Sequence, residues 1–185
     1  MEKTFILQAT DISIGYSNKK ETTTVASEVS VSLEKGKLTA LIGANGIGKS
    51  TLLRTLIGIQ SPLYGKVLLE NKDIHSIDNL TLAQHLSVVL TDKLPPSNLT
   101  VFELVALGRQ PYTNWIGKLT SEDIEKVKKA LELTQITHLA DKKHDEISDG
   151  QLQIVLIARA LAQDTPLIVL DEPTTHLDLS HKVTL

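Results

Sequence analysis

The sequence contains no cysteine, which excludes disulfide bonds and metal sites built on thiolates. It also lacks any apolar run approaching the ~20 residues needed to cross a bilayer, so a role at a membrane would require a partner protein. The net charge of −3 gives no basic field of the kind that attracts nucleic acids, and we expect no nucleic-acid partner. Aromatic residues form only 3% of the chain, so each one is a candidate for a specific contact.

Composition and periodicity change along the chain. With 185 residues, of which 41% are hydrophobic, it can form one sizeable core, alone or with a small appended subdomain. Apolar and polar residues alternate over 12–16 and 29–33, which predicts antiparallel strands in the first part. Short apolar runs at 65–69 and 86–90 predict two more strands. Residues 91–147 are more charged and have the spacing of helices, with apolar residues on one face only.

Helix starts are marked in this charged region. Thr100 and Glu103 have the spacing of a capping box, and Thr120 and Asp123 form a looser version of it. Strand character returns at 167–170. We expect an α/β fold in two parts. Residues 1–90 and 148–185 would form the core, with an antiparallel subdomain at its start, and residues 91–147 an inserted helical subdomain.

The strongest motif is the octapeptide GANGIGKS at 43–50, which fits the phosphate-binding loop pattern G-x-x-x-x-G-K-[ST]. The apolar run 38–42 before it predicts a buried strand, and residues 51–57 after it predict a helix. Glycines in such a loop let backbone N–H groups surround phosphate oxygens at the helix N-terminus. Lys49 would then reach the β- and γ-phosphates, and Ser50 would offer its hydroxyl to Mg²⁺. The alternative is a glycine-rich turn between a core strand and a core helix.

A second candidate site follows the apolar run 166–170, which predicts a buried parallel strand. Asp171 and Glu172 stand at its carboxyl end, the edge where open α/β sheets bind ligands. Asp171 could hold Mg²⁺, and Glu172 could polarise a water aimed at the γ-phosphate. The alternative is a pair of solvated acids after a core strand.

A third motif begins the last predicted helix. Ser148 is a good N-cap for a helix that extends to Ala162 and is apolar around much of its circumference. We therefore expect this helix to be buried on several sides. By spacing alone, Ser148 to Gln151 is an ordinary cap.

Together and in this order, these motifs resemble the nucleotide-binding subunit of ATP-binding-cassette (ABC) transporters over essentially the whole chain. Residues 147–151 (ISDGQ) resemble the family's signature sequence, residues 175–178 resemble its D-loop, and Tyr16 occupies the position of an aromatic that stacks on adenine. The resemblance implies a P-loop NTPase fold with a RecA-like core, an N-terminal antiparallel β subdomain and an inserted helical subdomain. It also implies binding and hydrolysis of ATP with Mg²⁺.

The resemblance assigns roles residue by residue. The catalytic residues that it implies are Glu172 and Lys49. The nucleotide-binding residues that it implies are Tyr16, Gly43, Asn45, Gly46, Gly48, Lys49, Ser50, Thr51, Ser148, Gly150, Gln151 and Asp178. The Mg²⁺ ligands that it implies are Ser50, Asp171 and Thr91.

Residues 107–112 and His176 most resemble the importers for iron–siderophores, haem and cobalamin. Three partners are implied: a second copy of the chain in a head-to-tail ATP-bound dimer, a membrane permease and, indirectly, an external substrate-binding protein. The expected location is the cytoplasmic face of the cell membrane. Tyr112 and Trp115 could dock on the permease or fill the core of the helical subdomain.

The chain departs from the family pattern at several points. The family usually has a glutamine that contacts Mg²⁺, the attacking water and the permease; spacing puts Thr91 there, with Asp92 beside it. Asp149 replaces a glycine, and Ile154 stands where a basic residue is common. The family continues past Leu185 with another strand and a histidine that contacts the γ-phosphate. We therefore expect a fragment truncated at its C-terminus, with slow or absent ATP hydrolysis.

Other functions fit parts of this pattern. One is an ABC ATPase of the translation or DNA-repair type, although no sustained heptads separate Ser50 from Ser148. Another is a small-molecule kinase or GTPase, although the guanine-reading Asn-Lys-x-Asp element is missing. A third is a nucleotide-binding scaffold with weak hydrolysis, which the departures at Thr91 and Asp149 favour.

Overall fold

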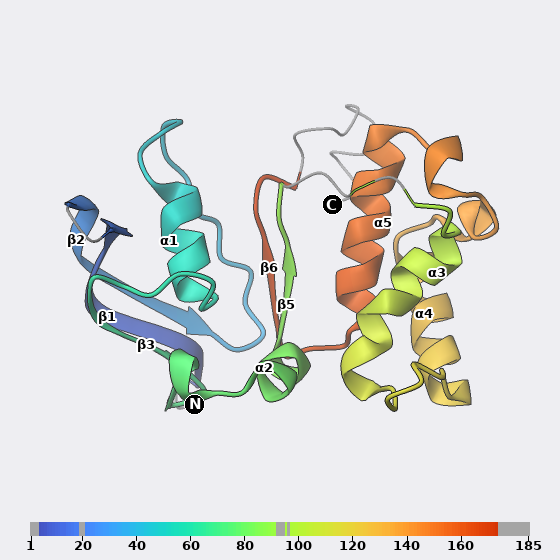
Figure 1. The fold of residues 1–185 in the computed structure, drawn as a ribbon, viewed down its shortest axis with the longest axis horizontal. Coiled ribbons are helices and arrows are strands. Elements are labelled where there is room, and N and C mark those ends of the chain that lie inside the picture. Colours follow the sequence, from blue (N-terminus) through green and yellow to red (C-terminus); the bar gives the residue numbers. More distant parts are fainter. Residues whose placement is uncertain (1–3, 19–20, 92–94, 96, 174–185) are drawn as a thin grey trace. The chain divides into compact units, whose positions relative to one another are not determined.

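A computed structural model describes residues 4–18, 21–91, 95 and 97–173. The chain forms two compact units, one of residues 1–82 and one of residues 83–185 (Figure 1). The domain boundaries expected from the sequence stay a prediction. No helix of the described residues is long and apolar enough to cross a membrane.

The first unit contains a four-stranded antiparallel sheet in the order β2-β1-β3-β4. Its strands are β1 (Phe5–Ser17), β2 (Thr22–Glu34), β3 (Tyr64–Leu69) and β4 (Lys72–Asp73). The alternation predicted strands here, and the structure confirms them. One face supplies the core, with Leu7, Ile12, Ile14, Val67 and Leu69 almost fully buried. Helix α1 (Lys49–Leu56) lies against β1 and buries Thr55 and Leu56.

The strand predicted at 38–42 is absent, and the prediction was wrong for this structure. These residues carry no assigned secondary structure, and Leu38 is 99% exposed. An apolar strand is stable only where neighbouring strands satisfy its backbone groups. In the sheet of the first unit the edge strands are β2 and β4, and neither pairs with 38–42.

The second unit combines a two-stranded parallel sheet with a group of helices. Strands β5 (Leu86–Val89) and β6 (Leu167–Leu170) pair in parallel, with Val89 opposite Leu170. The helices are α3 (Val101–Ala106), α4 (Ser121–Leu133) and α5 (Asp149–Ala162). Helix α2 (Asn79–His85) precedes β5. Short 3₁₀ helices are η1 (Ile74–Ser76), η2 (Leu107–Tyr112), η3 (Thr137–Leu139) and η4 (His144–Glu146).

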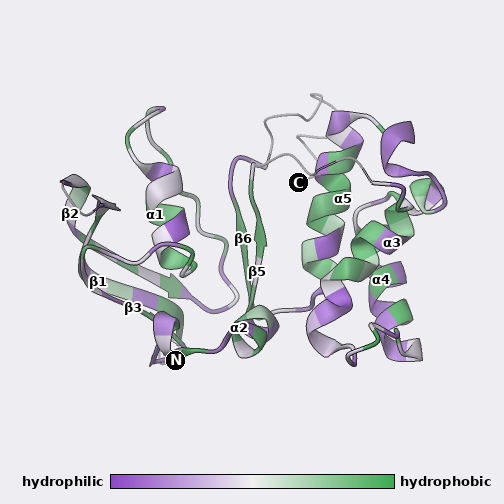
Figure 2. Cartoon of the chain, in the orientation of Figure 1, coloured by the Kyte–Doolittle hydropathy of each residue, from purple (hydrophilic) through white to green (hydrophobic). Residues whose placement is uncertain are grey.

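Helix α5 organises the second unit because it packs on two sides. One side, with Val155, Ala158 and Ala162, shares a core with α3 and α4. The other, with Leu156 and Ala160, packs against Val89 of β5 and against β6. Figure 2 shows hydrophobic residues along β5, β6 and much of α5. The expectation that this helix is buried on several sides is confirmed. Strand β6 is half-buried rather than buried, since within the described residues only β5 pairs with it.

The predicted helix starts are confirmed as capping boxes. Thr100 accepts from the N–H of Glu103, and Thr120 accepts from the N–H of Asp123. Ser148 accepts from the N–H of Gln151 in the same way. Each box satisfies two backbone N–H groups that an isolated helix end would leave unpaired.

Candidate nucleotide-binding site

The phosphate-loop motif has a backbone that glycine alone adopts without strain. Gly46 and Gly48 have φ values of 78° and 105°, in the left-handed region that disfavours other residues. Gly48 also faces Val25 of β2, because a Cβ atom added there would clash with a Val25 methyl carbon. The loop is thus shaped by its glycines and supported by the neighbouring strand.

Helix α1 begins directly from this loop. Its N-cap is Gly48, no side chain caps it, and its first turn contains no acidic residue. The first N–H groups of a helix lack intrahelical partners and carry partial positive charge. This end of α1 therefore fits an anionic group such as a phosphate.

Lys49 adds a formal positive charge at the same place. Its Nζ donates to the carbonyl oxygens of Gly43 and Ala44, both at 2.9 Å. The ammonium group is therefore held by the backbone of the phosphate loop. Phosphate oxygens would be stronger acceptors than these carbonyls, because they are charged.

Tyr16, near the end of β1, lies next to the start of α1. Its hydroxyl is 3.0 Å from Oγ1 of Thr51 in the first turn of α1. The side chain is 53% exposed. Stacking on a base needs an accessible ring face, so this position suits the expected role. The first unit thus brings together Tyr16, the loop 43–50 and Thr51.

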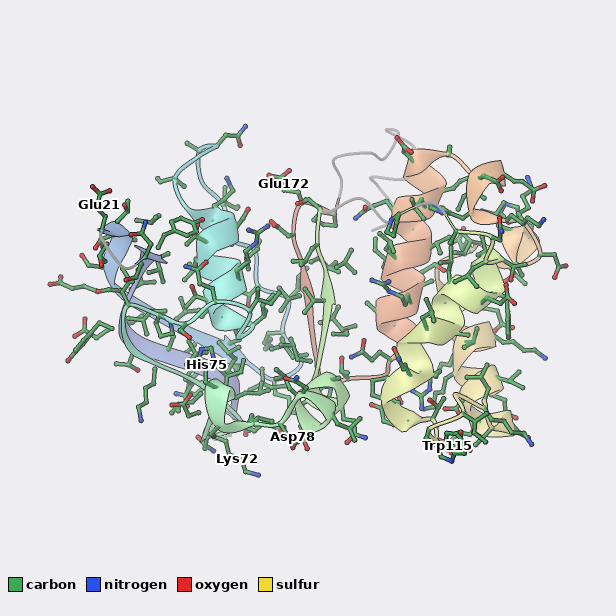
Figure 3. The ribbon with its side chains drawn as sticks, viewed as in Figure 1. Glu21, Lys72, His75, Asp78, Trp115 and Glu172 are labelled. Atoms are coloured by element: carbon green, nitrogen blue, oxygen red, sulfur yellow. The ribbon has the colours of Figure 1, made fainter. Side chains whose placement is uncertain are left out.

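In the second unit, the predicted acidic pair lies at the carboxyl end of β6 (Figure 3). Asp171 is buried, and its N–H donates to the carbonyl oxygen of Val89 at 2.9 Å. Glu172 is exposed and has a φ of 47°, a left-handed conformation that costs about 1–2 kcal/mol for such a residue. Strain of this kind often marks functional sites.

Thr91 follows the neighbouring strand β5. Val89 pairs with Leu170, and Thr91 comes two residues after the end of β5 just as Glu172 comes two residues after the end of β6. Thr91 is exposed, and its hydroxyl is accessible for a water or ion contact. Thr91, Asp171 and Glu172 thus follow the carboxyl ends of two paired strands, and their roles as metal or catalytic residues stay predictions.

The described residues contain no cluster of three or more His, Asp or Glu side chains that could hold a metal ion. Mg²⁺ in nucleotide enzymes is usually held by one or two protein groups together with phosphate oxygens. Ser50 in the first unit and Asp171 in the second each carry an oxygen of the right chemistry for such a role, and their assignment as Mg²⁺ ligands stays a prediction.

The signature-like segment forms the start of α5. Ser148 Oγ accepts from the Gln151 N–H at 3.2 Å, and Gln151 Oε1 accepts from the Ser148 N–H at 3.0 Å. Ser148 and Asp149 are exposed. Asp149 stands in the first helical turn, where a carboxylate stabilises the helix dipole. The position that holds glycine in the family pattern thus holds a residue that favours the start of a helix.

Asp178 and the rest of the D-loop-like segment at 175–178 lie outside the described part of the chain. The ligand contacts of Gly43, Asn45, Gly150 and the other assigned residues stay predictions.

Sequence reasoning missed a buried ion pair in the second unit. Arg109 in η2 donates to Asp123 of α4, with 2.9 Å between Nε and Oδ1, and also to the carbonyl oxygen of Ala162 at the end of α5. The Tyr112 ring stacks on the guanidinium, with 4.0 Å between Arg109 Cζ and the ring centroid. No periodicity links Arg109 with Asp123, although the capping box had marked Asp123.

Trp115 is 94% exposed, so it does not fill the core of this unit.

Comparison with known proteins identifies the family. The sequence profile described as "ABC transporter" matches residues 26–175. The ferric enterobactin transport ATP-binding protein FepC of Escherichia coli (strain K12) is 41% identical over 179 residues, covering 97% of this chain and 65% of FepC. The iron(3+)-hydroxamate import ATP-binding protein FhuC of Bacillus subtilis (strain 168) is 41% identical over 177 residues, covering 96% of this chain and 64% of FhuC. The chain spans less than two thirds of either relative.

Solved structures agree with the fold. A dimeric ATP-binding cassette in a post-hydrolysis state with ADP and Pi has a TM-score of 0.80 at 26% identity, covering 96% of this chain and 78% of the solved one. The expected α/β P-loop NTPase fold is thereby confirmed. The phosphate-loop geometry, the sequence profile and the similar structures all lead to one conclusion: this chain belongs to the ABC transporter family.

Proposed function

We propose that the chain is part of an ATP-binding and ATP-hydrolysing subunit that powers import of a metal chelate through a membrane permease. The observation that carries the proposal is the uncapped start of α1, preceded by two left-handed glycines and accompanied by Lys49. The names of FepC and FhuC, which refer to ferric enterobactin and iron(3+)-hydroxamate, support an iron chelate as cargo, within the iron–siderophore, haem or cobalamin class that the sequence resembles.

The roles of the residues follow from their chemistry. The N–H groups of the loop and of α1 bind the phosphates, and Lys49 exchanges its carbonyl partners for β- and γ-phosphate oxygens. Tyr16 offers its ring to the adenine. Ser50 and Asp171 are the residues that would hold Mg²⁺, which would supply positive charge beside the phosphates. Glu172 accepts a proton from the attacking water.

The partners and location belong to the same proposal. A similar ATP-binding cassette is a dimer, which supports a head-to-tail pair in which Ser148, Gly150 and Gln151 contact the nucleotide of the second copy. ATP would then favour the closed dimer, and hydrolysis would release it. A permease would hold the subunit at the cytoplasmic face of the membrane, and an external binding protein would supply the chelate.

The experiment compares the full-length subunit, of which we propose this chain is part, with two of its variants. We expect Lys49→Ala to lose binding of Mg–ATP, measured by titration calorimetry. We expect Glu172→Gln to bind Mg–ATP normally but to release phosphate at least about 100-fold more slowly, because an amide cannot act as the base. An unchanged rate of phosphate release in Glu172→Gln would contradict the assigned role.

A second candidate is a nucleotide-binding scaffold or non-transport ABC ATPase. The threonine at position 91, in place of the glutamine usual in the family, favours it. In vesicles that contain the permease and a chelate-loaded binding protein, an importer subunit releases phosphate faster than it does alone. A rate that does not respond to the permease would support the second candidate.

A further inference from the structure

The first unit contains a hydrogen bond that joins the expected adenine platform to the phosphate loop. The Tyr16 hydroxyl and Thr51 Oγ1 are 3.0 Å apart, although the two residues come from β1 and from the first turn of α1. Thr51 is 7% exposed, and its own carbonyl oxygen accepts from Thr55 Oγ1 at 2.9 Å. A buried β-branched side chain has few rotamers, and in the one observed the Thr51 hydroxyl faces the Tyr16 hydroxyl.

The number of available protons determines how this pair responds to an anion. Each hydroxyl has one proton to donate and can also accept, and in the free pair either oxygen can be the donor. A phosphate oxygen at the start of α1 can only accept. If Thr51 donates to the phosphate, its oxygen remains available to accept the proton of Tyr16. The series Tyr16–Thr51–phosphate then satisfies every group, and each hydrogen bond polarises the next.

We propose that Tyr16 is a positioning residue for the phosphates, acting through Thr51, in addition to any contact of its ring with the base. This inference rests on the proposed nucleotide binding at the same site. It has a consequence that stacking alone does not have. Loss of the Tyr16 hydroxyl weakens the binding of a polyphosphate that has no base.

The test measures binding of Mg–ATP and of Mg–tripolyphosphate to the full chain by titration calorimetry. Tyr16→Phe keeps the ring and removes the hydroxyl. We expect it to lower the affinity for both ligands by the same factor, about three- to tenfold, which corresponds to the loss of one hydrogen bond. Thr51→Val removes the hydroxyl that links Tyr16 to the phosphate, and it should lower the affinity for both ligands at least as much. In the double variant, Tyr16→Phe adds nothing to Thr51→Val, because the two residues act as one unit.

Two controls separate this role from a general loss of structure. Thr51→Ser keeps the hydroxyl and is expected to restore near wild-type binding. Tyr64→Phe makes the same change at an exposed tyrosine of β3 and is expected to have no effect. Thermal unfolding midpoints confirm that each variant is folded.

Three results would overturn the inference. The first is wild-type tripolyphosphate binding in Tyr16→Phe. The second is an undiminished effect of Tyr16→Phe in the Thr51→Val background. Both would leave the proposed function intact, provided that wild-type protein binds Mg–ATP. The third, wild-type protein that binds neither ligand, would refute the proposed function together with the inference.

Discussion

Arg109 and Asp123 show how single residues hold the second unit together. Both side chains are buried, and the guanidinium contacts the start of α4, the end of α5 and the Tyr112 ring. Asp123 also accepts from the N–H and the hydroxyl of Thr120 in the α4 capping box. One carboxylate therefore serves both a helix cap and an ion pair, so its removal affects two elements.

We predict that Asp123→Asn lowers the free energy of unfolding at pH 7 by about 3 kcal/mol, because it leaves a buried guanidinium without its counter-charge. The matched control is Asp164→Asn, which breaks the exposed pair of Asp164 with Lys126 and is expected to have a much smaller effect, because water and salt screen an exposed pair. Urea unfolding of both variants measures the difference. Equal losses would show that burial does not strengthen the Arg109 pair.

The same carboxylate makes stability depend on pH. Burial raises the pKa of Asp123, but hydrogen bonds from Thr120 and Arg109 outweigh it, so the pKa lies below its ordinary value. Ionised Asp123 thus stabilises the folded state fully above the unfolded-state pKa of about 4, and this contribution is lost as pH falls through the folded-state value. The gap between wild type and Asp123→Asn should therefore narrow below about pH 4.

Gly48 allows a second prediction about a single residue. Gly48→Ala must adopt a φ of 105° and places its Cβ against Val25. We expect it to lower the free energy of unfolding by about 2 kcal/mol or more and to weaken Mg–ATP binding, as measured by urea unfolding and calorimetry. Gly36→Ala is the control, since Gly36 has a φ of 74° with open space around it. Gly36→Ala should lower the free energy of unfolding through backbone strain but leave Mg–ATP binding unchanged. If Gly36→Ala weakened Mg–ATP binding and Gly48→Ala did not, the assignment of Gly48 to the phosphate loop would be contradicted.

At the scale of elements, local signals predicted structure well and non-local ones did not. The strands β1 and β2 alternate because one face of their sheet is buried, and three capping boxes need only residues three apart. These were predictable for that reason. The apolar run 38–42 has strand composition, yet composition does not supply a partner strand, and none pairs with it in the first unit's sheet.

The candidate site divides in the same way. The loop 43–50 and the acids after β6 were found from the sequence, because each is a short motif next to an apolar run. The Tyr16–Thr51 hydrogen bond and the contact of Gly48 with Val25 were not, since they join residues far apart in the chain. Sequence thus indicates which chemistry is present, whereas the supporting contacts require the fold.

At the scale of the whole molecule, exposed apolar residues of the second unit form a candidate surface for a partner. Trp115 is almost fully exposed (Figure 3), and Ile116 and Leu107 of the same unit are also exposed. Large apolar side chains on a surface often mark an interaction site. This exposure rules out the interpretation of Trp115 as a core residue and favours docking on the proposed permease.

We predict that Trp115→Ala changes the free energy of unfolding by less than about 0.5 kcal/mol, because an exposed side chain contributes little to folding. The same change should reduce the stimulation of phosphate release by permease-containing vesicles while leaving the rate without permease unaltered. Leu133→Ala, at another exposed leucine of this unit, is the control and should alter neither rate. Undiminished stimulation in Trp115→Ala would assign the permease contact to another surface, because loss of an aromatic anchor usually weakens an interface by more than about 1 kcal/mol.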